Sequence, residues 1–250
     1  MGNQASTYFF IGRLGSSPLR FQVQDADAGD GLRLDVYLDA ISAWGTTVEP
    51  FDTFRVAVRT TLDFIVAAYA FKARHALDYR LDNWVEVKGV IGNAGIVGRF
   101  LAPNEAPPTL PSTRSPTNTP WKLAARLNRS RLAGGVTQNH VLALRDYQQA
   151  MLDPSDNAFF FAWRAVEDVC RTVANVTDVS AAAWGTMNVA LNTTQQMTQP
   201  LNDASIAVRH NVMSPQRQAQ LAAARANRAQ TLNIAHQVVD AEMHRTFPWF

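Results

Sequence analysis

The sequence predicts an α+β fold: a small N-terminal antiparallel sheet with one helix, followed by a C-terminal α-helical bundle. Three observations predict it. Segments of alternating apolar and polar residues occur in the first hundred residues, a proline-rich segment follows, and helical periodicity continues from there to the end. These features divide the chain into an α+β domain at residues 1–102, a linker at residues 103–120 and a helical bundle at residues 121–250.

Two segments carry the strongest strand pattern. Residues 32–39 alternate strictly between apolar and polar side chains, and residues 77–82 do the same. The second pattern continues at Val85 and Val87 after a slip at Asn83. Weaker candidate strands, separated by glycine-containing turns, are residues 8–11, 19–23 and 96–101. Together these segments predict an antiparallel sheet with one buried face.

A single helix is predicted between the two strong strands. Asp52 is a residue type that caps helices, and the segment from Thr53 to Ala73 has a middle that is apolar on nearly every side. Because a helix that is apolar all round is normally buried, we expect this helix to pack on the sheet.

Residues 103–120 contain six prolines. Proline lacks the backbone donor that helices and sheet ladders use, so this segment predicts an extended linker and a domain boundary. Helical segments follow at residues 121–132, 137–152, 156–175, 179–191, 199–214 and 216–244. Short loops between helices of this length predict an up-and-down bundle.

The composition is that of an ordinary globular protein, because 47% of the 250 residues are hydrophobic, 18% are charged and the net charge is +2. The longest apolar window, residues 62–71, is well short of the roughly 20 residues that a membrane span requires. Cys170 is the only cysteine, which excludes an intrachain disulfide and a cysteine-built metal site. Motifs such as H-E-x-x-H and G-x-x-x-x-G-K are absent from the sequence. We therefore expect a cytoplasmic protein with no metal, no cofactor and no membrane partner.

Arg209 is the residue that most constrains the C-terminal part. On a helix it would lie among Ile206, Val212 and Met213, in an apolar stripe. Burial of a guanidinium in such surroundings costs on the order of several kcal/mol unless the group pairs with a carboxylate or a ligand. Glu167, at the edge of the apolar stripe of another helix, is the expected partner. Removal of Arg209 from a buried pair would then cost about 3–5 kcal/mol by stranding Glu167.

Two stretches resemble the HEPN domain, the helical fold of many prokaryotic toxin and defence ribonucleases. Residues 159–168 (FFFAWRAVED) resemble its aromatic helix with an acidic residue, and residues 206–214 (IAVRHNVMS) resemble its arginine–histidine signature. The resemblance covers residues 157–214. It implies a homodimer in which arginine and histidine from two copies cleave RNA without a metal, the arginine stabilising phosphate charge and the histidine transferring a proton.

The chain departs from this signature at one position. The family's histidine falls at Ser214, whose hydroxyl cannot act as an imidazole acid or base. His210, about 100° around the helix from Arg209, is the candidate substitute. The sequence therefore predicts a non-catalytic interaction or dimerisation protein of a prokaryotic defence or stress system. The alternative is a metal-independent endoribonuclease that uses Arg209 and His210, supported by Glu167.

A basic patch at the start of the helical region is a candidate RNA-binding surface. It consists of Lys122, Arg126, Arg129 and Arg131. These side chains either contact RNA phosphates or form a solvated helix face. RNA is thus a second candidate partner beside another copy of the chain.

Overall fold

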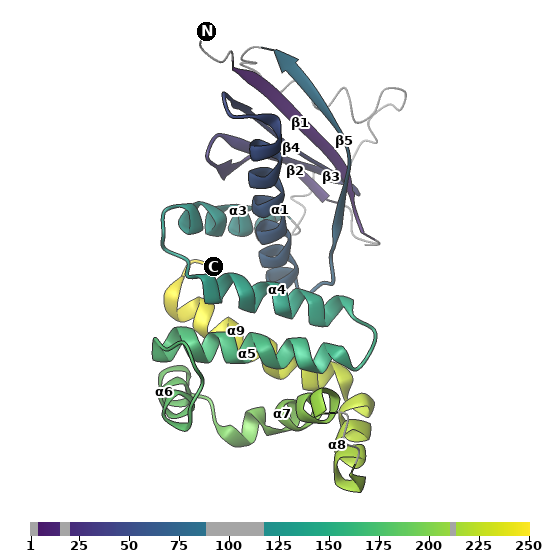
Figure 1. Ribbon diagram of the computed structural model, residues 1–250, viewed down its shortest axis with the longest axis vertical. Helices are drawn as coiled ribbons and strands as arrows, with labels where there is room; N and C mark the ends of the chain where they lie inside the picture. The colour runs from purple at the N-terminus through teal and green to yellow at the C-terminus, as the bar shows by residue number, and fades with distance from the viewer. Residues whose placement is uncertain (1–4, 16–20, 89–117, 211–213) are drawn as a thin grey trace. The chain divides into compact units, whose positions relative to one another are not determined.

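The computed structural model describes residues 5–15, 21–88, 118–210 and 214–250. These residues form two compact units. Unit 1 consists of Met1–Ala73 with Leu77–Ala133, and unit 2 consists of Arg74–Ala76 with Gly134–Phe250. The N-terminal sheet with its helix and the C-terminal helical region confirm the predicted α+β fold class (Figure 1).

Unit 1 contains a five-stranded antiparallel sheet with the strand order β2-β3-β4-β1-β5. Its strands are β1 (Ser6–Leu14), β2 (Phe21–Gly29), β3 (Leu32–Leu38), β4 (Ala40–Thr47) and β5 (Tyr79–Lys88). The two strongly alternating segments form β3 and β5, as predicted. The alternation did not indicate β4, because Ala40–Thr47 is apolar or small at nearly every position and all but its ends are buried. The candidate strand at residues 96–101 lies outside the described residues.

Helix α1 (Phe51–Ala73) is the predicted helix between the strong strands. Every residue from Thr61 to Phe71 except Asp63 is buried, which explains the apolar character on all sides of this segment. At its N-terminal end, the rings of Phe51 and Phe54 contact Tyr8 and Phe10 of β1, with centroids 5.3–6.1 Å apart. The aromatic face of β1 therefore packs against α1.

Helix α3 (Asn118–Leu132) belongs to unit 1 and not to the helical unit. Trp121 stacks on Tyr69 of α1 with ring centroids 4.1 Å apart, and Asn128 donates a hydrogen bond of 2.6 Å to the carbonyl of Ala28 in β2. The boundary between the units therefore lies at residues 133–134. The sequence had instead predicted that the helical bundle begins at residue 121. Periodicity shows that a helix has an apolar face but not which element covers it. Of the predicted linker, only residues 118–120 are described, and they begin α3.

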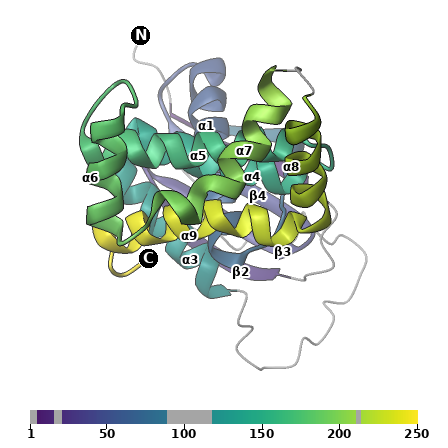
Figure 2. The ribbon, with the colours of Figure 1, turned by 90° about the horizontal axis from the view of Figure 1, so that it is seen from below.

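Unit 2 consists of helices (Figure 2). They are α4 (Gln138–Leu152), α5 (Asn157–Ala174), α6 (Ala181–Leu191), α7 (Gln195–His210), α8 (Pro215–Ala226) and α9 (Arg228–Thr246). Helix α5 packs against α4, α6, α7 and α9. Two expectations were wrong: α7 begins at Gln195, before the predicted residue 199, and the predicted helix at 216–244 is divided into α8 and α9 at Asn227. The side-chain amide of Asn227 donates a hydrogen bond to the carbonyl oxygen of Ala223, and this bond caps the C-terminal end of α8.

No helix within the described residues combines the length and the apolar content that crossing a bilayer demands.

Candidate functional site

Arg209 of α7 lies beside Glu167 of α5, which confirms the predicted pairing. Its Nη1 atom is 3.9 Å from Oε1 of Glu167, and the two side chains are 32% and 20% exposed. The guanidinium is thus partly buried between two helices, but the ion pair is long and water reaches both groups.

Glu167 has further partners on its own helix. The indole Nε1–H of Trp163 donates a hydrogen bond of 2.7 Å to Oε1, and Nη2 of Arg171 lies 3.9 Å from Oε2. Trp163 and Arg171 are four residues before and after Glu167, so all three side chains share one side of α5. The carboxylate therefore keeps two partners if Arg209 is removed.

An aromatic ring beside this pair contacts two cations. The Phe160 ring has the Arg209 guanidinium 5.9 Å and the Arg164 guanidinium 5.6 Å from its centroid, within the range of cation–π attraction. Arg164 also pairs with Asp146 of α4 at 3.0 Å. Phe160, Arg164, Glu167 and Arg209, which we call the Phe160 surface, bring aromatic and charged groups of α5 and α7 together at the partly exposed side of α5.

Two carboxylates beneath this surface have raised pKa values. Burial raises the pKa of Asp146 to about 6, although the charge of Arg164 opposes the shift. Burial also raises the pKa of Asp168, against the hydrogen bond of 2.6 Å that Arg171 donates to it. Because Asp146 takes up a proton as the pH falls toward 6, its neighbourhood becomes more positive there.

Of the residues in the predicted arginine–histidine signature, His210 lies with Arg209 on α7, whereas Ser214 caps α8. His210 is the last residue of α7, and its side chain is exposed. Ser214 has an extended backbone and begins α8, where its hydroxyl accepts a hydrogen bond of 3.3 Å from the backbone N–H of Arg217. The expectation that one helix carries both Arg209 and Ser214 was therefore wrong, and the position of the family's histidine has a capping role here.

The four residues of the predicted basic patch do not form one surface. Lys122, Arg126 and Arg129 are exposed at helical spacing, whereas Arg131 is partly buried. Arg129 donates a hydrogen bond of 2.5 Å to the backbone carbonyl of Asp27 in β2. The Arg131 guanidinium lies 5.3 Å from the centroid of the Phe64 ring, and burial lowers its pKa. Arg131 therefore packs within unit 1, and three residues remain on the exposed side of α3.

The sequence did not reveal a buried polar network in unit 2. Nε2 of His140 lies 3.1 Å from Oε1 of Glu242, and these side chains are 3% and 1% exposed. Arg245 donates two hydrogen bonds and Thr246 one to the same carboxylate. Burial acts to raise the pKa of Glu242, but these hydrogen bonds outweigh it and hold the pKa below its ordinary value. This network joins α4 to α9.

The hydrogen bond at its other ring nitrogen indicates the tautomer of His140. Nδ1 accepts the backbone N–H of Thr137 at 3.2 Å, so Nε2 carries the hydrogen that Glu242 accepts. The only local signal was the Thr137-x-x-His140 spacing of a capping box. Glu242 lies 102 residues further along the chain, and no pattern could connect the two. Among the residues that the structure describes, no group of three or more His, Cys, Asp or Glu side chains is arranged to hold a metal ion.

Most of the helical unit, together with the end of α3, matches one family model. Residues 127–244 match a family model described as the C-terminal domain of DUF8168, a domain of unknown function. The match spans α4 to α8 and nearly all of α9. No curated protein matches the chain, and no solved structure does either. The HEPN resemblance therefore stays a prediction based on residues 157–214.

Proposed function

We propose that the chain is a non-catalytic interaction protein that forms a homodimer through the Phe160 surface. The prokaryotic defence or stress setting and the cytoplasmic location belong to this proposal, the first on the HEPN resemblance and the second on the single cysteine. A second copy is the partner that the resemblance implies.

The position of Arg209 carries this proposal. An arginine–histidine nuclease needs a guanidinium that is open to phosphate and an imidazole that transfers a proton. Here the guanidinium lies against Glu167, and the hydroxyl of Ser214 caps α8. Both groups have structural partners that account for them without a reaction.

The chemistry of the Phe160 surface also supports an interface. Phe160 and Phe161 are partly exposed neighbours with ring centroids 5.6 Å apart, and arginines accompany them. Aromatic residues and arginine are enriched at the centres of protein interfaces. In a two-fold dimer the same patch faces itself, so arginine of one copy can meet Phe160 or Glu167 of the other.

Sedimentation of the full chain at tens of micromolar tests the dimer. We expect the wild type to sediment as a dimer and Phe160→Asp as a monomer. Val189→Asp is the matched control, because Val189 is an apolar residue of unit 2 that is 86% exposed and lies on α6; it should leave the dimer intact. A monomeric wild type contradicts the proposal.

The ribonuclease is the second candidate, because Arg209 retains partial exposure and His210 is open to solvent next to it. The assay is cleavage of single-stranded RNA in the presence of EDTA. We expect no cleavage by the wild type. Cleavage that both Arg209→Ala and His210→Ala abolish would establish the enzyme and overturn the non-catalytic proposal.

A further inference from the structure

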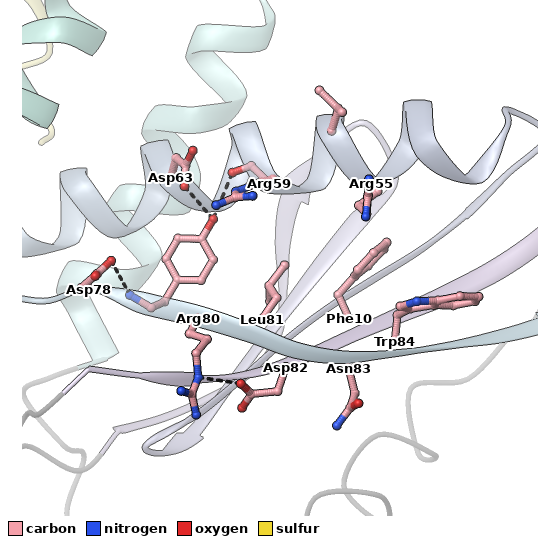
Figure 3. Close-up of a pocket in the computed structure, with 12 residues that line it drawn as sticks. Phe10, Arg55, Arg59, Asp63, Asp78, Arg80, Leu81, Asp82, Asn83 and Trp84 are labelled. Atoms are coloured by element: carbon pink, nitrogen blue, oxygen red, sulfur yellow. Dashed lines mark hydrogen bonds and ion pairs between the residues drawn. The ribbon is translucent and has the colours of Figure 1, made fainter.

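Unit 1 contains a cleft between α1 and the edge strand β5 (Figure 3). Its volume is about 650 Å³, and the apolar part of its lining consists of Phe10, Val56, Leu81 and Trp84. Small-molecule sites have volumes of this order and combine apolar walls with a few polar groups. The cleft is far in sequence from the Phe160 surface and was not identified from the sequence.

A bulge in β5 turns Trp84 toward this cleft. In the pairing with β1, Trp84 lies opposite Phe10 and Leu81 opposite Gly12, and the register shifts between these pairs. The strand thus contains one extra residue, and Leu81 and Trp84 share the face of Phe10. Regular alternation from Leu81 would instead have placed Asn83 there. Bulges that redirect a side chain occur often beside functional sites.

The bulge depends on a glycine in β1. A Cβ atom at Gly12 would lie 1.9 Å from the carbonyl oxygen of Arg80, which no side chain can tolerate. The redirected Trp84 is 50% exposed although its ring contacts Phe51, with centroids 4.3 Å apart. A large aromatic side chain held in place on one side and open on the other is a stacking surface for a planar ring.

The opposite wall of the cleft supplies positive charge. Arg55 and Arg59 extend from α1, one turn apart (Figure 3). Arg55 pairs with Asp52 at 3.2 Å, whereas Arg59 is exposed and has no ion pair among the described residues. The guanidinium of Arg59 is therefore available to an anion.

Three carboxylates also line the cleft, and each has a partner. Asp78 accepts the backbone N–H of Tyr79 at 2.7 Å, Asp82 pairs with Arg80 at 2.6 Å, and Asp63 accepts a hydrogen bond from Tyr79. The Tyr79 hydroxyl donates a hydrogen bond of 2.6 Å to Oδ1 of Asp63 and also lies 3.2 Å from the carbonyl of Arg59. Burial, and then the hydrogen bond to Asp63, raise the pKa of Tyr79, so the phenol keeps its proton and remains the donor. Asp63 thus does not neutralise Arg59 by direct pairing.

We propose that this cleft binds a planar aromatic ring joined to a phosphate, the chemistry of a nucleoside monophosphate. The ring stacks on Trp84, and the phosphate accepts hydrogen bonds from Arg59. This site is independent of the dimer, since it lies within unit 1.

Calorimetric titration of the full chain with adenosine 5′-monophosphate tests the site. We expect measurable binding below millimolar concentration, with adenosine and inorganic phosphate each binding at least about tenfold more weakly because each lacks one of the two contacts. A 5′-phosphorylated oligoadenylate separates the two sources of such a ligand. Tighter binding of the oligomer assigns the site to a strand end, and tighter binding of the monophosphate assigns it to a free nucleotide.

Two variants assign the contacts. Arg59→Ala and Trp84→Ala should each weaken binding of the monophosphate by about tenfold or more. Arg13→Ala is the matched control, because Arg13 is an exposed arginine of β1 that does not line the cleft; its affinity should stay within about twofold of the wild type. Absence of binding at millimolar monophosphate, or equal losses in Arg13→Ala and Arg59→Ala, overturns the proposal.

Discussion

Replacement of Arg209 by alanine measures how much the partly buried ion pair stabilises unit 2. The sequence suggested a cost of about 3–5 kcal/mol, the value for a buried carboxylate that loses its partner. The structure indicates a smaller loss. The pair with Glu167 is 3.9 Å long, and the arginine side chain is 32% exposed, so the pair contributes about 0.5–1 kcal/mol.

One other contact of Arg209 and one of Glu167 complete the expected loss of stability. The contact with the Phe160 ring at 5.9 Å adds about 0.5–1 kcal/mol at a partly exposed site. Glu167 is not stranded, because Trp163 still donates to it at 2.7 Å. The expected loss in the free energy of unfolding is therefore about 1–2 kcal/mol.

The assay is urea unfolding of the full chain, followed by far-ultraviolet circular dichroism. Arg209→Lys is the control, because lysine keeps the positive charge in the last turn of α7 and should lose less than Arg209→Ala. A loss of about 3 kcal/mol or more in Arg209→Ala would show that Glu167 depends on this partner alone. A loss of only a few tenths would show that the guanidinium is free in solution.

Three further outcomes are expected. Glu242→Ala should lower the free energy of unfolding by about 3–5 kcal/mol in urea titration, because it leaves buried polar groups unpaired, and a loss below about 1 kcal/mol would refute the buried network. Since the folded pKa of Glu242 is depressed, its contribution is present above the unfolded pKa and is lost as the pH falls through the folded value. The raised pKa of Asp146, about 6, acts with the opposite sign: stability that is present below the unfolded pKa is lost as the pH rises through about 6. Asp146→Asn should lack that part of the pH dependence in thermal unfolding at pH 4–8, and an unchanged profile would contradict the shift. If α3 binds RNA, filter binding should weaken steeply with salt, and a double change of Lys122 and Arg126 to alanine should reduce the salt slope by about 1–2. Salt-insensitive or absent binding removes the RNA hypothesis.

The local features of the chain could be read from its residues. Alternation identified β3 and β5, and the apolar middle of residues 53–73 identified α1 as a buried helix. The predicted continuation of the β5 alternation to Val85 and Val87 was wrong, because the bulge places Val85 opposite Phe9 and Trp84 opposite Phe10, so that Trp84 and not Val85 shares the face of Leu81. The pairing of Arg209 with Glu167 was also predicted, because a charge in an apolar helix stripe needs a partner and Glu167 stood at the edge of such a stripe.

The contacts between distant segments required the tertiary structure. Trp121 covers Tyr69, and His140 meets Glu242, although nothing in the neighbouring residues distinguishes these partners from others. The cleft likewise exists only because α1 lies beside β5. Periodicity is a property of consecutive residues and indicates which side of an element is apolar, so the sequence alone determined β3, β5 and the buried helix α1, but not β4, which has no alternation. The choice of the element that covers each face depends on the packing of the whole unit, and that packing decided where the buried network and the cleft are found.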